Sequence, residues 1–439
     1  MSPSGPAPDL QDLLAARPHL SLHALDGLCL EGVPLQFVAD QFGTPTYVYG
    51  AATIRARFAA LRDAFRAENV PMHIHYAVKA NDHLAILSLF RSQGAGADVV
   101  SIGEFLRAVQ AGIAPADIVY SGVGKAVYEL DIALRAGVGQ INVESAEEID
   151  MISALAANLG VTAAIALRMN PDVDAKTHAK ITTGLADNKF GIAASDIPAL
   201  YAHAATLPGL KVMGIAMHIG SQILSIEPYR QAYAKGAEMV QALRAAGQSV
   251  EVMDLGGGLG IGYQDEPGLS PYAFASMIRQ VCQGLNVRLM MEPGRYLVGP
   301  AGVLLTSVIL TKQAGKRFVV LDAGMNDLIR PAMYDAWHGL LPLAATAFHA
   351  PTSPAEVVGP ICESSDVFAR DRKLPNLAAG TRVALLDTGA YGAVMGNSYN
   401  ARPRPAAVLI DAGQSHLITP RQTHQELWEH EIIPRTFGG

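Results

Sequence analysis

The segment His73–Asn81, HIHYAVKAN, is the first of eight short apolar segments that decide the fold. Its residues favour a buried strand that ends on Lys79, and Asn81 favours the start of a helix. Burial of a lysine amine at the end of a strand lowers its pKa and makes it a usable nucleophile. The alternative is a lysine whose stem lies along the sheet while its amine reaches water.

The pattern of His73–Asn81 recurs along the chain. The first four segments begin at residues 73, 97, 118 and 140, so the intervals are 24, 21 and 22 residues, which fits a strand, a helix and two short loops. Alternating strands and helices predict a parallel sheet, and eight such units predict a closed (β/α)₈ barrel of about 250 residues. An open doubly wound sheet is the alternative. The seven further strands are expected at Ala97–Val100, Ile118–Tyr120, Gln140–Val143, Ala163–Met169, Gly214–Ile219, Val250–Leu255 and Val287–Met291, with helices such as Asn81–Ser92, Gly103–Ala111, Val127–Ala136 and Ser145–Leu159 between them.

Polar residues follow the predicted strands. In a barrel of this kind, chemistry takes place at the carboxyl ends of the strands, which all face one rim. We therefore expect one rim to carry Lys79, Ser101, Ser121, Asn170, His218, Ser221, a glycine cluster, Glu292 and Arg295.

The chain changes character after Gly302, where β-rich segments replace the alternating pattern. Strands are expected at Leu304–Thr311, Arg317–Asp322, Glu356–Ile361, Arg382–Leu386 and Ala406–Ile410. The strand at the end of Phe37–Tyr49 has no place in the barrel. We therefore predict a barrel domain over 50–302 and a discontinuous β-rich domain over 1–49 and 303–439. Residues 1 to about 20 are expected to be poorly ordered, and the polar segment Asn170–Ile192 is expected to be a surface loop or to fold over the barrel mouth.

Composition excludes several classes of function. The net charge is −7 and no basic block is present, so nothing indicates binding to nucleic acid or to an anionic membrane. The proline-rich start lacks the features of a signal peptide, and no apolar run approaches the roughly 20 residues that span a bilayer. The three cysteines, Cys29, Cys282 and Cys362, are far apart, which argues against a disulfide framework or a metal site and for a reducing cytoplasm.

The glycine-rich segment Asp254–Tyr263, DLGGGLGIGY, follows the seventh predicted strand. Its backbone N–H groups can close on an anion such as phosphate, whereas no frame matches the GxGxxG pattern of dinucleotide-binding folds. A flexible turn is the alternative. His218 offers a flat ring at the same rim, although a lone histidine is often a packed core residue. Glu292 and Arg295 lie three residues apart across a Pro-Gly bend and could equally form a structural ion pair.

An amine, a phosphate site, a flat ring and a carboxylate together are what pyridoxal 5′-phosphate requires. The motifs YAVKAN, HIGSQ, GGGLGIGY, EPGR, CESSD and DTGAYG, in this order, resemble the fold-type III pyridoxal-phosphate-dependent decarboxylases, whose fold is alanine-racemase-like. The resemblance is strongest to the diaminopimelate decarboxylases and runs from about Gly43 to Arg404.

The resemblance implies a role for each matching residue. Lys79 would form the Schiff base with the cofactor, Glu292 would bond the pyridine nitrogen, and Cys362 would protonate the product carbon. Cys362 and Glu363 would come from the partner subunit, which implies a homodimer with shared active sites. The remaining cofactor contacts would be His218, stacked on the ring, with Ser221, Gly257, Gly258, Gly260, Gly294, Arg295 and Tyr391, and the substrate contacts would be Arg295, Arg330, Tyr334, Glu363 and Tyr391.

The implied reaction is decarboxylation of meso-2,6-diaminopimelate to L-lysine and CO₂, the last step of lysine biosynthesis, in the cytoplasm. An arginine fork suits a distal carboxylate and repels the terminal amine of ornithine or lysine. Alternatives are a decarboxylase of ornithine, lysine, arginine or carboxynorspermidine, an amino-acid racemase, and a non-catalytic homologue. Glu292 speaks against a racemase, and the presence of Lys79 and Cys362 speaks against a non-catalytic chain.

Overall fold

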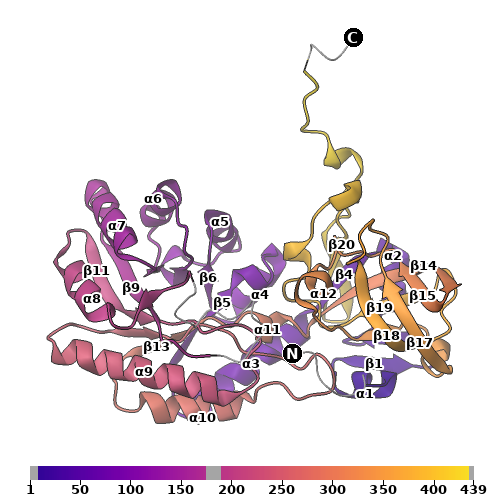
Figure 1. The fold of residues 1–439 in the computed structure, drawn as a ribbon, viewed down its shortest axis with the longest axis horizontal. Coiled ribbons are helices and arrows are strands. Elements are labelled where there is room, and N and C mark those ends of the chain that lie inside the picture. Colours follow the sequence, from indigo (N-terminus) through magenta and orange to yellow (C-terminus); the bar gives the residue numbers. More distant parts are fainter. Residues whose placement is uncertain (1–7, 175–188, 435–439) are drawn as a thin grey trace. The chain divides into compact units, whose positions relative to one another are not determined.

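The computed structural model describes residues 8–174 and 189–434, which form two compact units (Figure 1). The first unit consists of Ile54–Gly262 and Pro267–Val298. The second consists of the residues up to Thr53, together with Tyr263–Glu266 and the chain from Gly299 onward.

The first unit is a closed barrel of parallel strands. Each strand pairs with the next, β5 pairs with β13, and β8 pairs with β9, so the ring has no open edge. The predicted (β/α)₈ barrel is therefore confirmed, and the alternative of an open sheet is wrong. In chain order the strands are β5 (Met72–Ala77), β6 (Gly96–Val99), β7 (Ile118–Tyr120), β8 (Gln140–Val143), β9 (Ala163–Asn170), β11 (Leu210–Ala216), β12 (Val252–Asp254) and β13 (Arg288–Met291), with the short β10 (Ile192–Ala193) beside β9.

Helices surround the strands of the barrel, and α5, α6, α7 and α8 are seen outside them in Figure 1. In α3, the apolar stripe of Ile54, Phe58, Leu61 and Phe65 is at most 2% exposed. None of the helices in the described ranges has the length and hydrophobicity needed to cross a bilayer. The helices are α3 (Ala51–Ala67), α4 (Leu84–Ser92), α5 (Ile102–Gln110), α6 (Val127–Ala136), α7 (Ala146–Leu159), α8 (Ile197–Thr206), α9 (Ile226–Ala245), α10 (Pro271–Cys282) and α11 (Arg295–Val298).

The chain after β5 differs from the expected strand-to-helix transition. Lys79 lies in the single turn of 3₁₀ helix η1 (Val78–Ala80), one turn beyond the strand. Asn81 does not start the next helix, because its backbone is extended and its side chain accepts from the backbone N–H of His83. His83 caps α4 through a hydrogen bond from Ala85 N. The extra turn places Lys79 at the rim.

The barrel interior is a packed core. Val119, Met213, Val252 and Met290, from four different strands, form one buried cluster. Gly214 lies where β11 and β12 approach closely, and a Cβ atom there would lie 1.9 Å from the carbonyl oxygen of Val252. The predicted sixth strand, Gly214–Ile219, is shifted, because the observed β11 begins at Leu210 and ends at Ala216.

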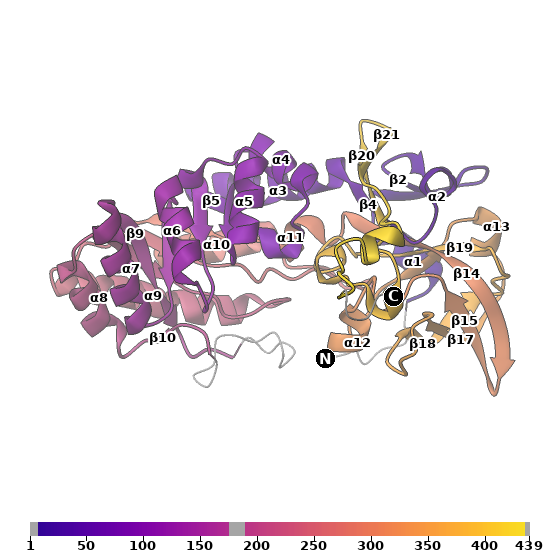
Figure 2. The same cartoon turned by 90° about the horizontal axis from the view of Figure 1, so that it is seen from above.

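The second unit is mostly β-structure, and Figure 2 shows its strands from above. The main sheet has the order β18-β17-β15-β14-β4-β20-β21, and β19 pairs with both β14 and β16. The strand before residue 50, β4, pairs with β14 and β20 in this sheet. The strands of this main sheet are β4 (Thr46–Gly50), β14 (Gly302–Ala314), β15 (Lys316–Leu321), β16 (Leu340–Pro342), β17 (Thr352–Val358), β18 (Val367–Pro375), β19 (Arg382–Leu385), β20 (Ala406–Asp411) and β21 (Gln414–Thr419).

Smaller elements complete the second unit. A separate three-stranded sheet consists of β1 (Leu20–His23), β2 (Gly27–Leu30) and β3 (Val33–Pro34). The short helices are α1 (Leu10–Ala15), α2 (Leu35–Phe42), α12 (Arg330–Tyr334) and α13 (Ala345–Phe348).

The expectation of a poorly ordered start is wrong for the part of it that the structure describes. Asp9 caps α1, and Leu13 is buried. Arg17 is 3% exposed and forms an ion pair of 2.5 Å with Asp387, with further hydrogen bonds to the carbonyl oxygens of Leu13 and Tyr263. The N-terminal helix is therefore fixed to the second unit. Most of the polar segment Asn170–Ile192 lies outside the described residues.

We predict that Arg17→Ala destabilises the second unit, because it leaves the buried carboxylate of Asp387 without this cation. Removal of one partner of a buried ion pair costs about 3–5 kcal/mol. Urea unfolding of the variant and the parent measures the difference. Arg66→Ala is the control, since the side chain of Arg66 is 73% exposed. Equal stability of Arg17→Ala and Arg66→Ala would contradict the prediction.

Candidate active site

A cavity of about 480 Å³ opens at the carboxyl ends of the barrel strands. This volume is in the range of small-molecule and cofactor sites. Residues from six of the eight strand ends contribute polar groups, and the lining includes Lys79, Ser121, Asn142, Arg168, His218 and Glu292. The structure therefore brings together three of the predicted site residues, Lys79, His218 and Glu292, at one cavity.

Lys79 forms an ion pair with a carboxylate that the sequence analysis missed. Its Nζ atom lies 2.6 Å from Oδ2 of Asp98, whose side chain is completely buried, whereas the side chain of Lys79 is 32% exposed. The amine is thus not the isolated, desolvated amine that the sequence predicts. Asp98 holds it at a fixed place while leaving it accessible from the cavity.

Glu292 follows β13 directly, and its backbone N–H donates to the carbonyl oxygen of Gly256 at 2.7 Å. The side chain is 6% exposed. Burial, and then the nearby carboxylates of Asp254 and Asp98, raise the pKa of Glu292 well above its usual range. Asn142 on β8 donates to Oε1 of Glu292 at 3.3 Å and to Oδ2 of Asp254 at 3.2 Å.

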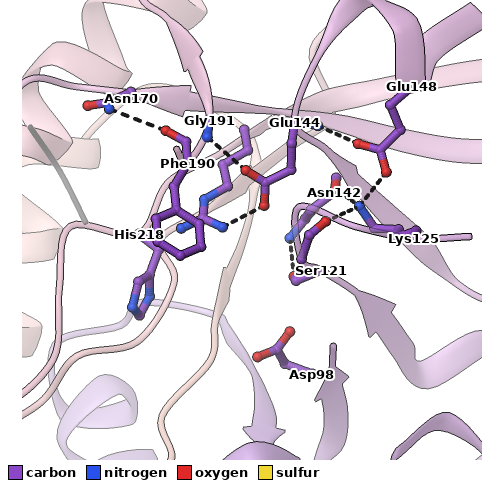
Figure 3. A network of polar contacts seen from close by, with 12 residues as sticks. Asp98, Ser121, Lys125, Asn142, Glu144, Glu148, Asn170, Phe190, Gly191 and His218 are labelled. Carbon is purple, nitrogen blue, oxygen red and sulfur yellow. Dashed lines mark hydrogen bonds and ion pairs between the residues drawn. The ribbon is translucent and has the colours of Figure 1, made fainter. Parts of the chain in front are cut away.

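A second network of polar contacts lies next to the residues that line the cavity, and Figure 3 shows its members Glu144, Glu148 and Lys125. Arg168 donates to Glu144 at 2.6 Å, and the other carboxylate oxygen of Glu144 accepts from Gly191 N at 2.7 Å. Deeper in the unit, the amine of Lys125 lies 2.7 Å from Glu148, which in turn accepts from Glu144 N. The network fixes the guanidinium of Arg168 at the cavity wall. Phe190, which also lines the cavity, lies against this guanidinium at 5.0 Å.

His218 lies just beyond β11 and is a neutral imidazole. Its Nδ1 atom accepts from Gly257 N at 3.2 Å, so the ring proton is on Nε2. Burial, and then the cations Arg168 and Lys79, lower the pKa of His218 well below its usual value. A neutral flat ring at this place is suited to stacking on an aromatic ligand.

The glycine-rich segment after β12 is required by close packing. A Cβ atom at Gly257 would lie 2.2 Å from the carbonyl oxygen of Glu292, and one at Gly258, whose φ is +99°, would lie 2.4 Å from that of Gly220. The N–H groups of Gly257 and Gly260 donate to His218 and to Ile223. The predicted role in phosphate binding therefore stays a prediction, while the need for glycine has a steric cause.

The turn after Glu292 brings two further predicted residues together. At Gly294 a Cβ atom would lie 2.9 Å from that of Ala80, so glycine allows this turn to pack against η1. Arg295 is 7% exposed and donates to the hydroxyl of Ser221 at 3.1 Å. The guanidinium and the hydroxyl thus form one polar group in the barrel unit.

The other predicted residues belong to the β-rich unit. Cys362 and Glu363 are exposed, and Oε1 of Glu363 accepts from the hydroxyl of Tyr399 at 2.6 Å. Arg330 is buried, with its guanidinium 2.8 Å from His338 Nε2 and over the ring of Tyr263. Tyr334 and Tyr391 are half-buried. The backbone of Tyr391 is in the left-handed region, with a φ of 56°.

Several residues of the cavity region were missed by sequence reasoning: Asp98, Asn142, Arg168 and Asp254. Each of these residues lies inside a predicted strand. The sequence analysis considered only polar residues at or after the strand ends and therefore did not identify them. The available signal was a single charged residue within an otherwise apolar strand, such as Arg168 in AAIALRMN. A buried charge of this kind requires a partner and is therefore informative.

Comparison with known proteins agrees with this geometry. The family model described as "Pyridoxal-dependent decarboxylase, pyridoxal binding domain" matches residues 51–299. The chain is 48% identical to diaminopimelate decarboxylase of Zymomonas mobilis over 411 residues, which cover 92% of this chain and 96% of the relative. It is 45% identical to the Pseudomonas aeruginosa enzyme, with 92% and 97% covered.

The chain belongs to the diaminopimelate decarboxylase family. Among solved structures of this family, the Helicobacter pylori enzyme complexed with L-lysine matches with a TM-score of 0.87 and 39% identity, over 90% of this chain and 98% of that chain. The M. jannaschii enzyme in co-complex with L-lysine matches with a TM-score of 0.90 and 35% identity, over 95% and 99%. The family predicted from the six sequence motifs is thus confirmed.

We predict that His218 stays neutral in mildly acidic solution, because burial and the cations Arg168 and Lys79 disfavour its protonated form. A histidine with an ordinary pKa changes charge near about pH 6.5. In ¹³C-histidine NMR spectra, the His218 signal, assigned by its loss in His218→Gln, should not move between about pH 7.5 and 5.5. A titration midpoint near the ordinary value would contradict this.

Proposed function

We propose that the chain decarboxylates meso-2,6-diaminopimelate to L-lysine and CO₂, the last step of lysine biosynthesis, with pyridoxal 5′-phosphate as cofactor. The observation that carries the proposal is the amine of Lys79, held by Asp98 at the edge of the rim cavity in a chain of the diaminopimelate decarboxylase family. We further propose 50–302 as the cofactor-binding domain and the cytoplasm as the location.

The residues of the barrel unit fit this cofactor. The cavity has an accessible amine, a neutral flat ring and a buried acid. Lys79 would anchor the aldehyde, His218 would stack on the ring, and Glu292 would bond the ring nitrogen. The phosphate would be held by Ser221, Gly257, Gly258, Gly260, Gly294 and Arg295. Among the described residues, no group of three or more His, Cys, Asp or Glu side chains is arranged to hold a metal ion.

When bound, the cofactor supplies a ring that accepts the electron pair released with CO₂. The chain's own residues do the rest. Lys79 would hold the cofactor. When its amine is free, it would donate a hydrogen bond to Asp98, as it does in this structure. Cys362 would donate a proton to the carbon that has lost CO₂, and its thiolate would be protonated again before the next turnover.

Substrate choice is assigned to a second set of residues. An arginine fork binds a carboxylate with two parallel hydrogen bonds, and it repels an ammonium group. The distal carboxylate and ammonium of meso-diaminopimelate would be bound by Arg295, Arg330, Tyr334, Glu363 and Tyr391. We also propose that the chain acts as a homodimer whose shared sites each combine Lys79 of one subunit with Cys362 and Glu363 of the other.

The first test is covalent trapping of the cofactor. Borohydride reduction of the protein loaded with pyridoxal phosphate should leave the cofactor on the peptide that contains Lys79, as found by mass spectrometry. Lys79→Ala should lose this adduct and the visible absorbance of lysine-bound cofactor. Lys211→Ala, at an exposed lysine, should keep both. An adduct retained by Lys79→Ala would refute the assignment of Lys79.

The second test is a CO₂-release assay with a panel of substrates. We expect kcat/KM for meso-diaminopimelate to exceed that for L-lysine, L-ornithine and L-arginine by at least about 100-fold, because a site built for a polar group rejects analogues that lack it. Turnover of one of the other amino acids at a comparable rate would assign the chain to a different substrate.

The third test concerns the shared site. Lys79→Ala and Cys362→Ala should each have very low activity alone. If each site takes one residue from each subunit, random re-pairing of an equal mixture restores one intact site in half of the dimers, or about a quarter of the parent activity. A mixture no more active than its components would show that the two residues do not meet across subunits.

A further inference from the structure

We propose that Asp254 and Asn142 make Glu292 a stored proton donor: Asp254 stays ionised, Glu292 carries the proton, and Glu292 passes it to the ring nitrogen as the cofactor binds. Asp254 and Asn142 act as positioning residues, since they work through Glu292. The inference rests on the proposed function only in naming the ring nitrogen as acceptor.

The geometry consists of two buried carboxyl groups on one amide. Asp254 is completely buried, and Glu292 is 6% exposed. Asp254 is the last residue of β12, and Glu292 directly follows the neighbouring strand β13. The amide nitrogen of Asn142 lies 3.2 Å from Asp254 Oδ2 and 3.3 Å from Glu292 Oε1. Each carboxyl group thus accepts from the same amide nitrogen. Two buried carboxyl groups that share one donor favour a proton on one of them, because two negative charges at one buried site disfavour each other.

The Asn142 amide has two further partners. Its Oδ1 atom accepts from Nε2 of Gln140 at 2.9 Å, and its amide nitrogen also donates to the hydroxyl of Ser121 at 3.1 Å. The amide nitrogen is a donor and cannot receive a proton. A proton shared by the two acids is therefore on Asp254 or on Glu292.

The hydrogen bonds assign the proton to Glu292. Both oxygens of Asp254 accept from N–H donors, Oδ1 from Gly256 N at 3.0 Å and Oδ2 from Asn142 at 3.2 Å, and such donors favour the ionised form. Glu292 lines the cavity, whereas Asp254 lies behind it. Burial, and then the charges of Asp254 and Asp98, raise the pKa of Glu292, which also favours a proton on Glu292.

The other charged groups around Glu292 do not remove this proton. Asp98 on β6 adds a second negative charge, which favours the protonated form of Glu292. Lys79 is the cation that acts against it, but its amine is 2.6 Å from Asp98. Burial lowers the pKa of His75 on β5, which keeps this ring neutral. Across the cavity, Arg168 is paired with Glu144 at 2.6 Å.

The proposed transfer balances in protons and charge. Glu292 loses its proton and becomes a carboxylate, and the ring nitrogen gains that proton, so no proton is exchanged with solvent. The positive ring nitrogen would then be paired with the negative Glu292. The protein thereby binds the unprotonated ring and still obtains the protonated form that draws electrons.

The test is infrared spectroscopy of the wild-type chain with carboxyl-¹³C labels, in which a protonated carboxyl group gives its own C=O band. Burial raises the pKa values of Glu104 and Asp327 to about 7, so the spectra are recorded at about pH 8.5 or above, where these groups are mostly ionised. The cofactor-free protein should show a band that shifts with labelled glutamate and not with labelled aspartate. The band should be absent after loading with pyridoxal phosphate. A shift with labelled aspartate, no band, or a band that persists after loading would overturn the proposal.

Variants add a second measurement. Glu292→Gln should abolish the band. Asp254→Asn, which keeps the size of the side chain but removes its charge, should lower the pH midpoint of the band by at least about one unit, since a negative neighbour raises the pKa of an acid. Asp327→Asn, in the β-rich unit, should leave the midpoint unchanged. An unchanged midpoint in Asp254→Asn would refute the role of Asp254. The cofactor-free spectra do not depend on turnover, so loss of the proposed decarboxylation and failure of this inference are separate outcomes.

Discussion

The closed parallel sheet is the constraint on which the site depends. Because every strand of the barrel runs in the same direction and β8 pairs with β9, the residues that follow the strands meet at one rim. Groups separated by more than 200 residues, such as Lys79 after β5 and Glu292 after β13, line one cavity for this reason. The barrel interior below these groups is filled with side chains. The cavity therefore lies at the rim and does not continue along the barrel axis.

Burial of charge at this rim is possible because the charges are paired. Lys79 with Asp98, Arg168 with Glu144, and Lys125 with Glu148 have N–O distances of 2.6–2.7 Å. Such pairs add little net stability, but breaking one leaves an uncompensated charge at a cost of about 3–5 kcal/mol. Their main effect is geometric, since each pair has one arrangement that satisfies both partners. Lys79 and Arg168 are therefore held by carboxylates where they line the cavity.

The sequence predicted the barrel, its strand positions to within a few residues, and the residues that follow the strands, because alternating apolar and helical patterns depend on local spacing. It did not predict Asp98, Arg168 or Asp254, since their importance comes from partners far away in the chain. The ordered start was missed for the same reason: Arg17 is fixed by Asp387, 370 residues away. In the β-rich unit, β18 was missed because four consecutive charged residues, Arg370–Lys373, interrupt the apolar pattern of VFARDRKLP, although Arg372 is buried.

One strand pair links the glycine-rich loop, the predicted phosphate site, to the buried acid Glu292. In the register of β12 and β13, Asp254 lies opposite Met290, and Glu292 N donates to Gly256 O. Asp254 in turn accepts from Gly256 N, so Gly256 is hydrogen-bonded to the carboxylate of Asp254 and to the backbone of Glu292. A Cβ atom at Gly257 would push against the Glu292 carbonyl. Gly256 and Gly257 therefore determine how closely the loop packs against Asp254 and Glu292, apart from any contact with an anion.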